Sequence, residues 1–112
     1  MIRLGAFLGY TFQGPVPLAR ARLPEAPGVF AVLRTPGAGN PSYSVLDVDE
    51  AADLSEEVGP GHPRAACWAE VAGADQLAVA YFVVQAERPT RRRQVAGELR
   101  ECYDPPCAAP GE

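Results

Sequence analysis

Three stretches of the chain carry the strongest hydrophobic pattern. Residues 28–34 form a nearly continuous run of β-branched and aromatic side chains, which predicts a buried strand. Residues 43–48 have the same character after a loop over 35–42, so the two stretches predict an antiparallel hairpin. Residues 76–84 are more apolar still, and we expect them to form the central strand of the sheet.

Helix signals follow the hairpin. Asp49 is a suitable N-cap for a helix over 50–58, and Gly59-Pro60 marks its end. Residues 67–71 predict a short extended segment.

A second helix begins after Thr90, which we expect to be its N-cap. Its apolar face consists of Val95, Leu99 and either Cys102 or Tyr103. Pro105 and Pro106 end it, because proline cannot continue a helix.

These elements predict a small α+β domain in the order β-β-α-β-α, with a three-stranded antiparallel sheet flanked by helices. Residues 24–107 form this domain. Residues 1–23 mix apolar and turn-forming residues and predict an irregular N-terminal arm packed on the domain, with a short strand near residues 4–12. Residues 108–112 predict a flexible tail.

Composition narrows the class of protein. A chain of 112 residues, 47% of them apolar, has enough material for one domain with a modest core. No apolar run approaches the ~20 residues of a membrane span, so we expect a cytoplasmic protein with no membrane partner. Three cysteines are an odd number, which favours reduced thiols over a disulfide framework.

Charge argues against a nucleic-acid partner. The net charge is −4 and all ten basic residues are arginine. Proteins that bind nucleic acid usually present a positive stripe, because neutralising phosphates supplies most of the non-specific affinity. A protein partner is therefore favoured over nucleic acid.

Four motifs occur in one order along the chain. They are Pro27-Gly28-Val29-Phe30, then Asp47-Val48-Asp49, then Asp53-Leu54, and finally Leu99 followed by Tyr103, Pro105, Pro106 and Cys107. Together they resemble the GIY-YIG nuclease superfamily, and the resemblance covers about residues 24–107. It implies a small antiparallel sheet flanked by helices.

The same resemblance implies that the chemistry is lost. In that family a tyrosine of the first motif activates the nucleophile, a helix arginine stabilises the phosphate, and a glutamate holds a divalent metal. The corresponding positions here are Phe30, Glu57 and Ala96, while Asp47-Val48-Asp49 replaces the second motif. None of these side chains can perform the family's roles, so we expect no nuclease activity, no metal and no cofactor.

Acidic residues gather where the active site of a nuclease would lie. Six acids occur within eleven residues, without a basic residue among them: Asp47, Asp49, Glu50, Asp53, Glu56 and Glu57. An acidic concavity of this kind suits a divalent cation or an arginine-rich partner, or mimics a phosphate backbone. The simpler interpretation is a solvated face whose acids favour the helix dipole, and we prefer it over a metal site.

Two further groups have a functional and a structural interpretation. His62, Cys67, Cys102 and Cys107 resemble a zinc set only marginally in spacing, so packed or idle thiols are favoured. Trp68 is expected in the core and not as a platform for a nucleic-acid base.

An arginine run opens the last helix at Arg88, Arg91, Arg92 and Arg93, where positive charge opposes the helix dipole. Pairing with Glu87 or with acids elsewhere in the domain is the favoured explanation. Binding of phosphate or carboxylate groups is the alternative.

The leading hypothesis is a catalytically inactive GIY-YIG-like domain that acts as a binding or protein-interaction module. Its candidate binding residues are Asp47, Asp49, Asp53, Glu57, Arg91, Arg92 and Arg93. One alternative is a metal-dependent endonuclease or phosphodiesterase with a rebuilt carboxylate site, and another is a nucleic-acid-binding remnant. The oligomeric state stays open.

Overall fold

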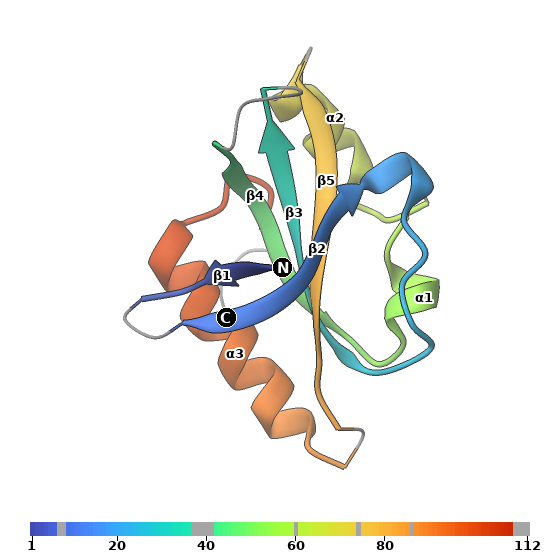
Figure 1. Ribbon diagram of the computed structural model, residues 1–112, viewed down its shortest axis with the longest axis vertical. Coiled ribbons are helices and arrows are strands. Elements are labelled where there is room, and N and C mark those ends of the chain that lie inside the picture. The colour runs from blue at the N-terminus through green and yellow to red at the C-terminus, as the bar shows by residue number, and fades with distance from the viewer. Residues whose placement is uncertain (7–8, 37–41, 60, 74, 86, 109–112) are drawn as a thin grey trace.

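A computed structural model describes residues 1–6, 9–36, 42–59, 61–73, 75–85 and 87–108 (Figure 1). Its strands are β1 (Ile2–Leu4), β2 (Tyr10–Pro17), β3 (Gly28–Thr35), β4 (Ser44–Ala51) and β5 (Gln76–Val83). Its helices are the 3₁₀ turn η1 (Leu18–Arg20), α1 (Leu54–Glu57), α2 (Ala65–Ala72) and α3 (Pro89–Tyr103).

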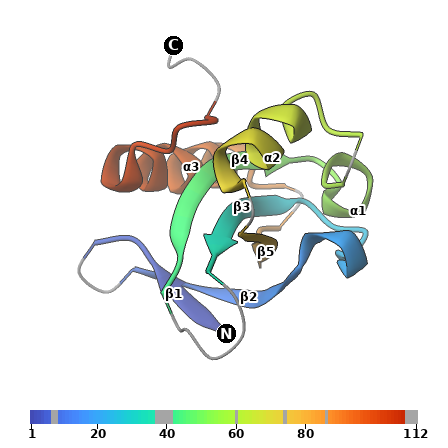
Figure 2. The same ribbon diagram turned by 90° about the horizontal axis from the view of Figure 1, so that it is seen from above.

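The sheet has five antiparallel strands in the order β1-β2-β5-β3-β4, so the prediction of a three-stranded sheet was wrong. The segment expected to be an irregular arm supplies β1 and β2. Its strand signal is weak because the pairing of β2 with β5 shifts between Gln13 and Val16, which breaks the two-residue alternation of side chains. Seen from above, the β1–β2 end bends away from the other strands and curls the sheet (Figure 2).

The expected hairpin and central strand are confirmed. β3 pairs antiparallel with β4, and β5 lies in the middle of the sheet between β2 and β3. Residues 28–33 of β3 are buried without interruption, which matches the apolar run in the sequence. Of the hairpin loop, residues 37–41 lie outside the described part of the chain, as do residues 109–112 of the expected tail.

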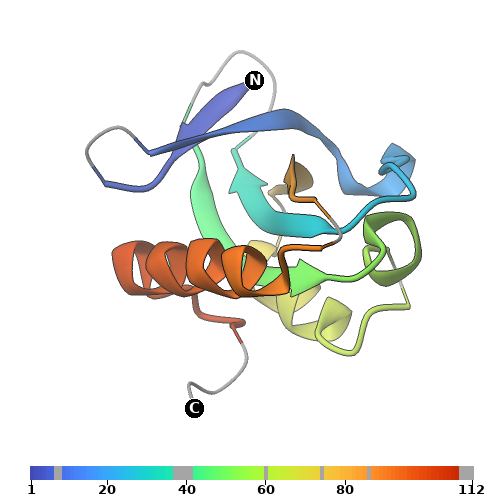
Figure 3. The same cartoon turned by 90° about the horizontal axis from the view of Figure 1, so that it is seen from below.

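Side chains from opposite faces of the sheet form two cores. The first contains Val29 and Ala31 of β3, Phe12 of β2, and Val95 and Leu99 of α3. The second contains Phe30 and Val32 of β3 together with residues from α1 and α2. α3 therefore covers one face, while α1 and α2 cover the other (Figure 3). No helix among the described residues is both long and apolar enough to cross a membrane.

The helix over 50–58 is shorter than predicted. β4 continues to Ala51, and only Leu54–Glu57 is helical. The N-cap is Asp53, whose carboxylate accepts a hydrogen bond from the Ser55 backbone N–H at 3.0 Å. Asp49 is not the cap because the strand pairing, with Phe30 opposite Asp49, holds that residue in the sheet.

Residues 67–71 form part of α2 and not an extended segment. The helix packs the buried indole of Trp68 into the second core, so the expectation that Trp68 is a core residue is confirmed. Burial of this side chain outweighs the weak local signal, since tertiary packing routinely overrides propensity.

The last helix begins two residues earlier than expected, so Thr90 is not its N-cap. Arg88 occupies the N-cap without a side-chain hydrogen bond and Pro89 is the first helical residue. Val95 and Leu99 are buried as predicted, whereas Cys102 is exposed. Tyr103 completes the apolar face, and its hydroxyl accepts the Gly5 backbone N–H at 2.9 Å.

Cys67 and Cys107 form a disulfide with 5.9 Å between their Cα atoms, so the expectation of reduced thiols was wrong for this pair. Cys107 lies just beyond α3, where its backbone N–H donates to the Leu46 carbonyl of β4 at 2.8 Å. That contact places the thiol against α2, 40 residues away in sequence. Sequence spacing carries no signal of this proximity.

Candidate functional site

The strand register brings the two motif positions together. Phe30 of β3 lies opposite Asp49 of β4, and Val32 lies opposite Asp47. Side chains on opposed residues of paired strands share a face, so Phe30, Asp47 and Asp49 face α1 and α2. Ala96 is a residue of α3 and belongs to the core on the other face, so the sheet separates it from Phe30.

Asp47 is completely buried. Its Oδ2 accepts hydrogen bonds from Arg64 Nε and from Trp68 Nε1, each at 2.7 Å. A buried carboxylate is costly unless it is paired and hydrogen-bonded, and here one guanidinium and one indole satisfy both needs. Both donors come from the segment around the start of α2, which fixes that helix against β4.

Asp49 joins two arginines from different helices. Its two carboxylate oxygens accept from Arg64 Nη2 at 2.6 Å and from Arg100 Nη2 at 2.8 Å. Arg100 also donates its Nε to the Val48 carbonyl at 3.1 Å, on the outer edge of β4. The side chain thereby covers part of an otherwise open strand edge and ties α3 to the sheet.

The four side chains Asp47, Asp49, Arg64 and Arg100 form a charge-balanced cluster, which we call the arginine–aspartate network. Burial lowers the pKa of Arg64, but the hydrogen bonds that it donates to Asp47 and Asp49 outweigh this effect and raise that pKa above its ordinary value. Within the described part of the chain, no buried side-chain nitrogen or oxygen lacks a partner. The network is therefore built to hold elements together, and its oxygens are occupied by donors.

Of the other four acids in the group, two make structural contacts and two are exposed. Glu50 accepts from Arg92 Nε at 3.4 Å and Asp53 caps α1. Glu56 and Glu57 are exposed and line a pocket of about 380 Å³ with His62 and Pro63. In the described ranges, no group of three acidic, cysteine or histidine residues has a geometry that could hold a metal ion.

His62 connects this pocket to the network. Its Nδ1 accepts the Arg64 backbone N–H at 3.0 Å, so the neutral ring carries its proton on Nε2. The ring stacks on Trp68 at 4.7 Å between centroids and meets the Phe30 ring edge-on at 5.8 Å. Burial, and then the nearby Arg64 charge, lower the pKa of His62 below 6.5, which favours the neutral form.

The arginine run at the start of α3 is partly paired across the domain. Arg92 bonds to Glu50, and the Arg91 guanidinium lies over the Tyr10 ring at 5.4 Å. The Tyr10 hydroxyl donates to Glu98, and this hydrogen bond is the main reason that the pKa of Tyr10 is raised. Arg88 and Arg93 are exposed.

Sequence reasoning missed Arg64, Trp68 and Arg100 as partners of the acidic group. The acids have no basic residue beside them in sequence, yet Arg64 at the N-cap of α2 and Arg100 of α3 reach them. Lone arginines on polar helix positions have no pattern that distinguishes a partner from a solvated charge. Only the fold of the helices onto β4 pairs them.

We compared the chain with protein-family models, with curated proteins and with solved structures, and none of them matched.

Proposed function

We propose that the protein is a non-catalytic binding domain that engages a protein partner through a cationic side chain. The observation that carries this proposal is that some of the clustered acidic residues are paired with arginines and others are not. Asp47, Asp49 and Glu50 are neutralised by arginines, whereas Glu56 and Glu57 line a pocket and have no ion pair among the described residues.

Three features support the absence of catalysis. Phe30 carries no ionisable group and is fully buried. The oxygens of Asp47 and Asp49 accept from guanidinium and indole donors, so neither carboxylate is available as a general base. Ala96 lies in the core on the opposite face of the sheet.

The chemistry of the pocket favours arginine over lysine as the recognised side chain. The two oxygens of a carboxylate match the forked donors of a guanidinium more specifically than an ammonium, and two carboxylates, those of Glu56 and Glu57, line the pocket. Neutral His62 on the same rim adds no repulsive charge. The pocket is therefore suited to an arginine presented by a flexible segment of a partner.

Nuclear magnetic resonance titration with the peptide acetyl-Gly-Arg-Gly-amide tests this proposal. We expect amide shifts around Glu56, Glu57 and His62, and affinity at least about fivefold weaker for the peptide with citrulline in place of arginine. The variant Glu56→Gln/Glu57→Gln should lose the same preference. Glu70→Gln is the matched control, because Glu70 is an exposed acid on α2 outside the pocket. Equal binding of both peptides would contradict the proposal.

One observation favours a second candidate function, the binding of nucleic acid. Arg88 and Arg93 are exposed at the start of α3, and Arg91 lies beside them. Retention of a labelled single-stranded oligonucleotide over a salt series tests it. For binding through phosphate contacts, the logarithm of the binding constant falls linearly with the logarithm of the salt concentration. Retention lost on Arg88→Gln/Arg93→Gln would support this candidate over the protein partner.

A rebuilt metal-dependent phosphodiesterase has less support. Such a site would take its metal ligands from Asp47, Asp49 and Glu57, but the two aspartates bind Arg64 and Glu57 lines a separate pocket. Incubation of branched and single-stranded DNA with Mg²⁺ or Mn²⁺ should show no cleavage. Cleavage that disappears in Asp49→Ala would contradict the non-catalytic proposal.

A further inference from the structure

A second cavity lies at the opposite end of α2 from the arginine–aspartate network. It is a groove of about 600 Å³ between η1, the last turn of α2 and the start of β5. Leu18 and Leu77 line it and also pack against the second core, so its floor is continuous with the apolar interior. Its size falls within the range of about 300–1,000 Å³ that is typical of small-molecule sites.

The end of α2 keeps this groove open. Gly73 follows the helix with φ +60°, and a Cβ built there would meet no heavy atom within 4 Å. Ala69 and Ala72 face the same space with their short side chains. The walls are thus made of small residues, and nothing in the described part of the chain fills the volume between them and η1.

The charged side chains at the rim of the groove differ in whether they have an ion-pair partner. Asp75 is paired with Arg34 at 3.6 Å, and Arg34 also donates to the Val71 carbonyl at 3.1 Å. Arg20 lines the groove, is exposed, and has no ion pair or hydrogen bond to any described residue. With Asp75 balanced by Arg34, the rim carries one uncompensated positive charge.

We propose that this groove binds a small amphipathic carboxylate, with its apolar chain against Leu18, Ala72 and Leu77 and its carboxylate on Arg20. An apolar floor takes a hydrocarbon body, while a guanidinium at the rim provides two parallel donors for a carboxylate. A cationic ligand would be repelled by Arg20 and would have to compete with Arg34 for Asp75. A neutral one would leave Arg20 without a partner.

Octanoate, 1-octanol and octylammonium have the same chain with three different head groups, and they are the probes for this site. We would titrate each into ¹⁵N-labelled protein and follow the amide resonances. The structure predicts shifts around Leu18, Ala72 and Leu77, with octanoate binding about five- to tenfold more tightly than octanol and octylammonium weakest.

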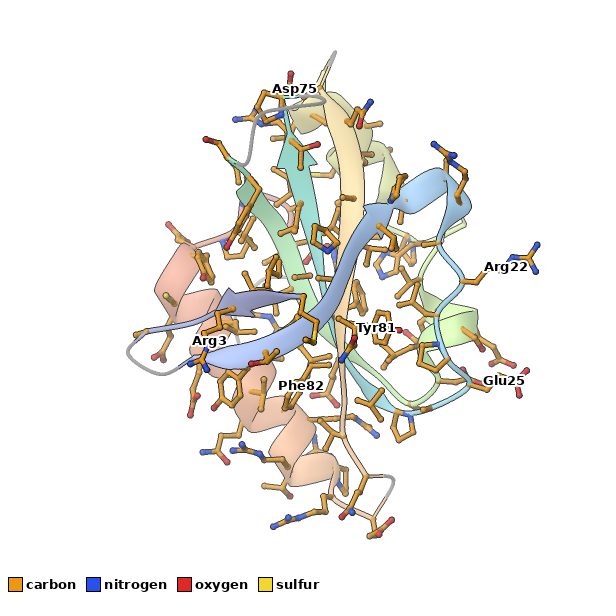
Figure 4. All side chains as sticks on the ribbon, in the orientation of Figure 1. Arg3, Arg22, Glu25, Asp75, Tyr81 and Phe82 are labelled. Carbon is orange, nitrogen blue, oxygen red and sulfur yellow. A yellow bond between two sulfur atoms is a disulfide. The ribbon has the colours of Figure 1, made fainter. Side chains whose placement is uncertain are left out.

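Three variants separate the parts of the proposal. Arg20→Gln should reduce the affinity for octanoate to that of octanol and leave octanol binding unchanged. Arg22→Gln is the matched control, since Arg22 is also exposed but points away from the body of the protein (Figure 4). Ala69→Trp should fill the groove and abolish binding of all three probes.

Other outcomes would overturn the assignment. Equal affinity for octanoate and octanol would show that Arg20 does not bind the head group. Tighter binding of octylammonium than of octanoate would show that Asp75 binds the head group instead. Absence of shifts at the groove in the folded wild-type protein would eliminate the site. Glu56→Gln/Glu57→Gln should bind octanoate normally, because its pocket is lined by a separate set of residues.

Discussion

Asp47 has the most constrained environment of any charged residue described in the protein. Its side chain is fully buried, and its Oδ2 accepts hydrogen bonds from Arg64 and Trp68. A buried ion pair does not by itself stabilise a fold, but removing one partner leaves an uncompensated charge in a low-dielectric interior. The arginine–aspartate network is therefore more sensitive to single substitutions than to its complete replacement.

Arg64→Met tests this asymmetry. The substitution keeps an apolar stem but removes the guanidinium from Asp47 and Asp49, so we expect the free energy of unfolding to fall by about 3 kcal/mol. Urea denaturation followed by tryptophan fluorescence measures it. Arg93→Met should change stability by less than about 0.5 kcal/mol, because Arg93 is exposed. Adding Asp47→Asn to Arg64→Met should restore part of the loss, and an additive loss would contradict the network.

His62 predicts a pH dependence of stability. Its folded-state pKa is lowered below 6.5, so the unfolded chain binds the proton more tightly than the folded protein. Its contribution to stability is therefore fully present above pH 6.5 and is lost as the pH falls toward the folded-state pKa. His62→Asn should flatten the decline in melting temperature between about pH 7.5 and 5.5. If the melting temperature of the variant falls with pH as steeply as that of the wild type, groups other than His62 cause the decline.

At the scale of elements, the outer edge of β4 shows how short segments stabilise one another. Arg100 donates to the Val48 carbonyl and Cys107 donates to the Leu46 carbonyl, so two groups from the C-terminal region cover an exposed strand edge. The Cys67–Cys107 disulfide then holds that region against α2. The disulfide thus joins α2 covalently to the segment after α3, and hydrogen bonds join that segment and α3 to β4 of the hairpin.

Reduction of this disulfide should destabilise the protein without changing its fold. Its two cysteines are 40 residues apart, and a closed loop of that length contributes about 3–4 kcal/mol in the chain-entropy model. Denaturation with and without dithiothreitol measures the effect, and Cys67→Ala/Cys107→Ala should match the reduced protein. Cys102→Ser should be neutral because Cys102 is free and exposed. Equal stability of reduced and oxidised protein would contradict a stabilising role.

At the scale of the whole molecule, residues 1–23 are integrated into the fold. The radius of gyration is 12.9 Å, close to the value of about 13 Å expected for a compact chain of this length. Leu4 and Phe12 are completely buried in the first core, and Phe12 stacks on Phe82 of β5 with 5.5 Å between centroids. Figure 4 shows Phe82 beneath the β1–β2 segment.

Deletion of residues 1–23 should therefore abolish cooperative unfolding. Loss of Leu4, Phe12 and Leu23 removes three buried side chains worth about 1.5–3 kcal/mol each, which is comparable with the whole stability of a small domain. The deletion also exposes one edge of β5. Circular dichroism during heating measures the result, and a sharp transition near that of the full chain would show that residues 24–112 fold alone.

Local pattern by itself determined the strands that have a strong apolar run of their own. β3, its hairpin with β4 and the apolar β5 were predictable for this reason: β3 and β4 are buried along most of their length, and β5 is buried at its centre, over residues 78–80. The buried face of α3 was predictable from Val95 and Leu99 at helical spacing. The pairing of Phe30 with Asp49 was not predictable, because the sequence alone left the register of the hairpin open.

Tertiary structure alone decided which polar groups meet. The acids at Asp47 and Asp49 acquire their partners from Arg64 and Arg100, 15 and 51 residues away from Asp49, and the disulfide forms across a similar distance. Charge pairing of this kind leaves no periodicity, because it depends on how helices settle on a sheet. For the same reason only the structure shows that Asp47 and Asp49 are paired internally while Glu56 and Glu57 line an open pocket. It also shows that β1 and β2 are strands, through their pairing with the rest of the sheet.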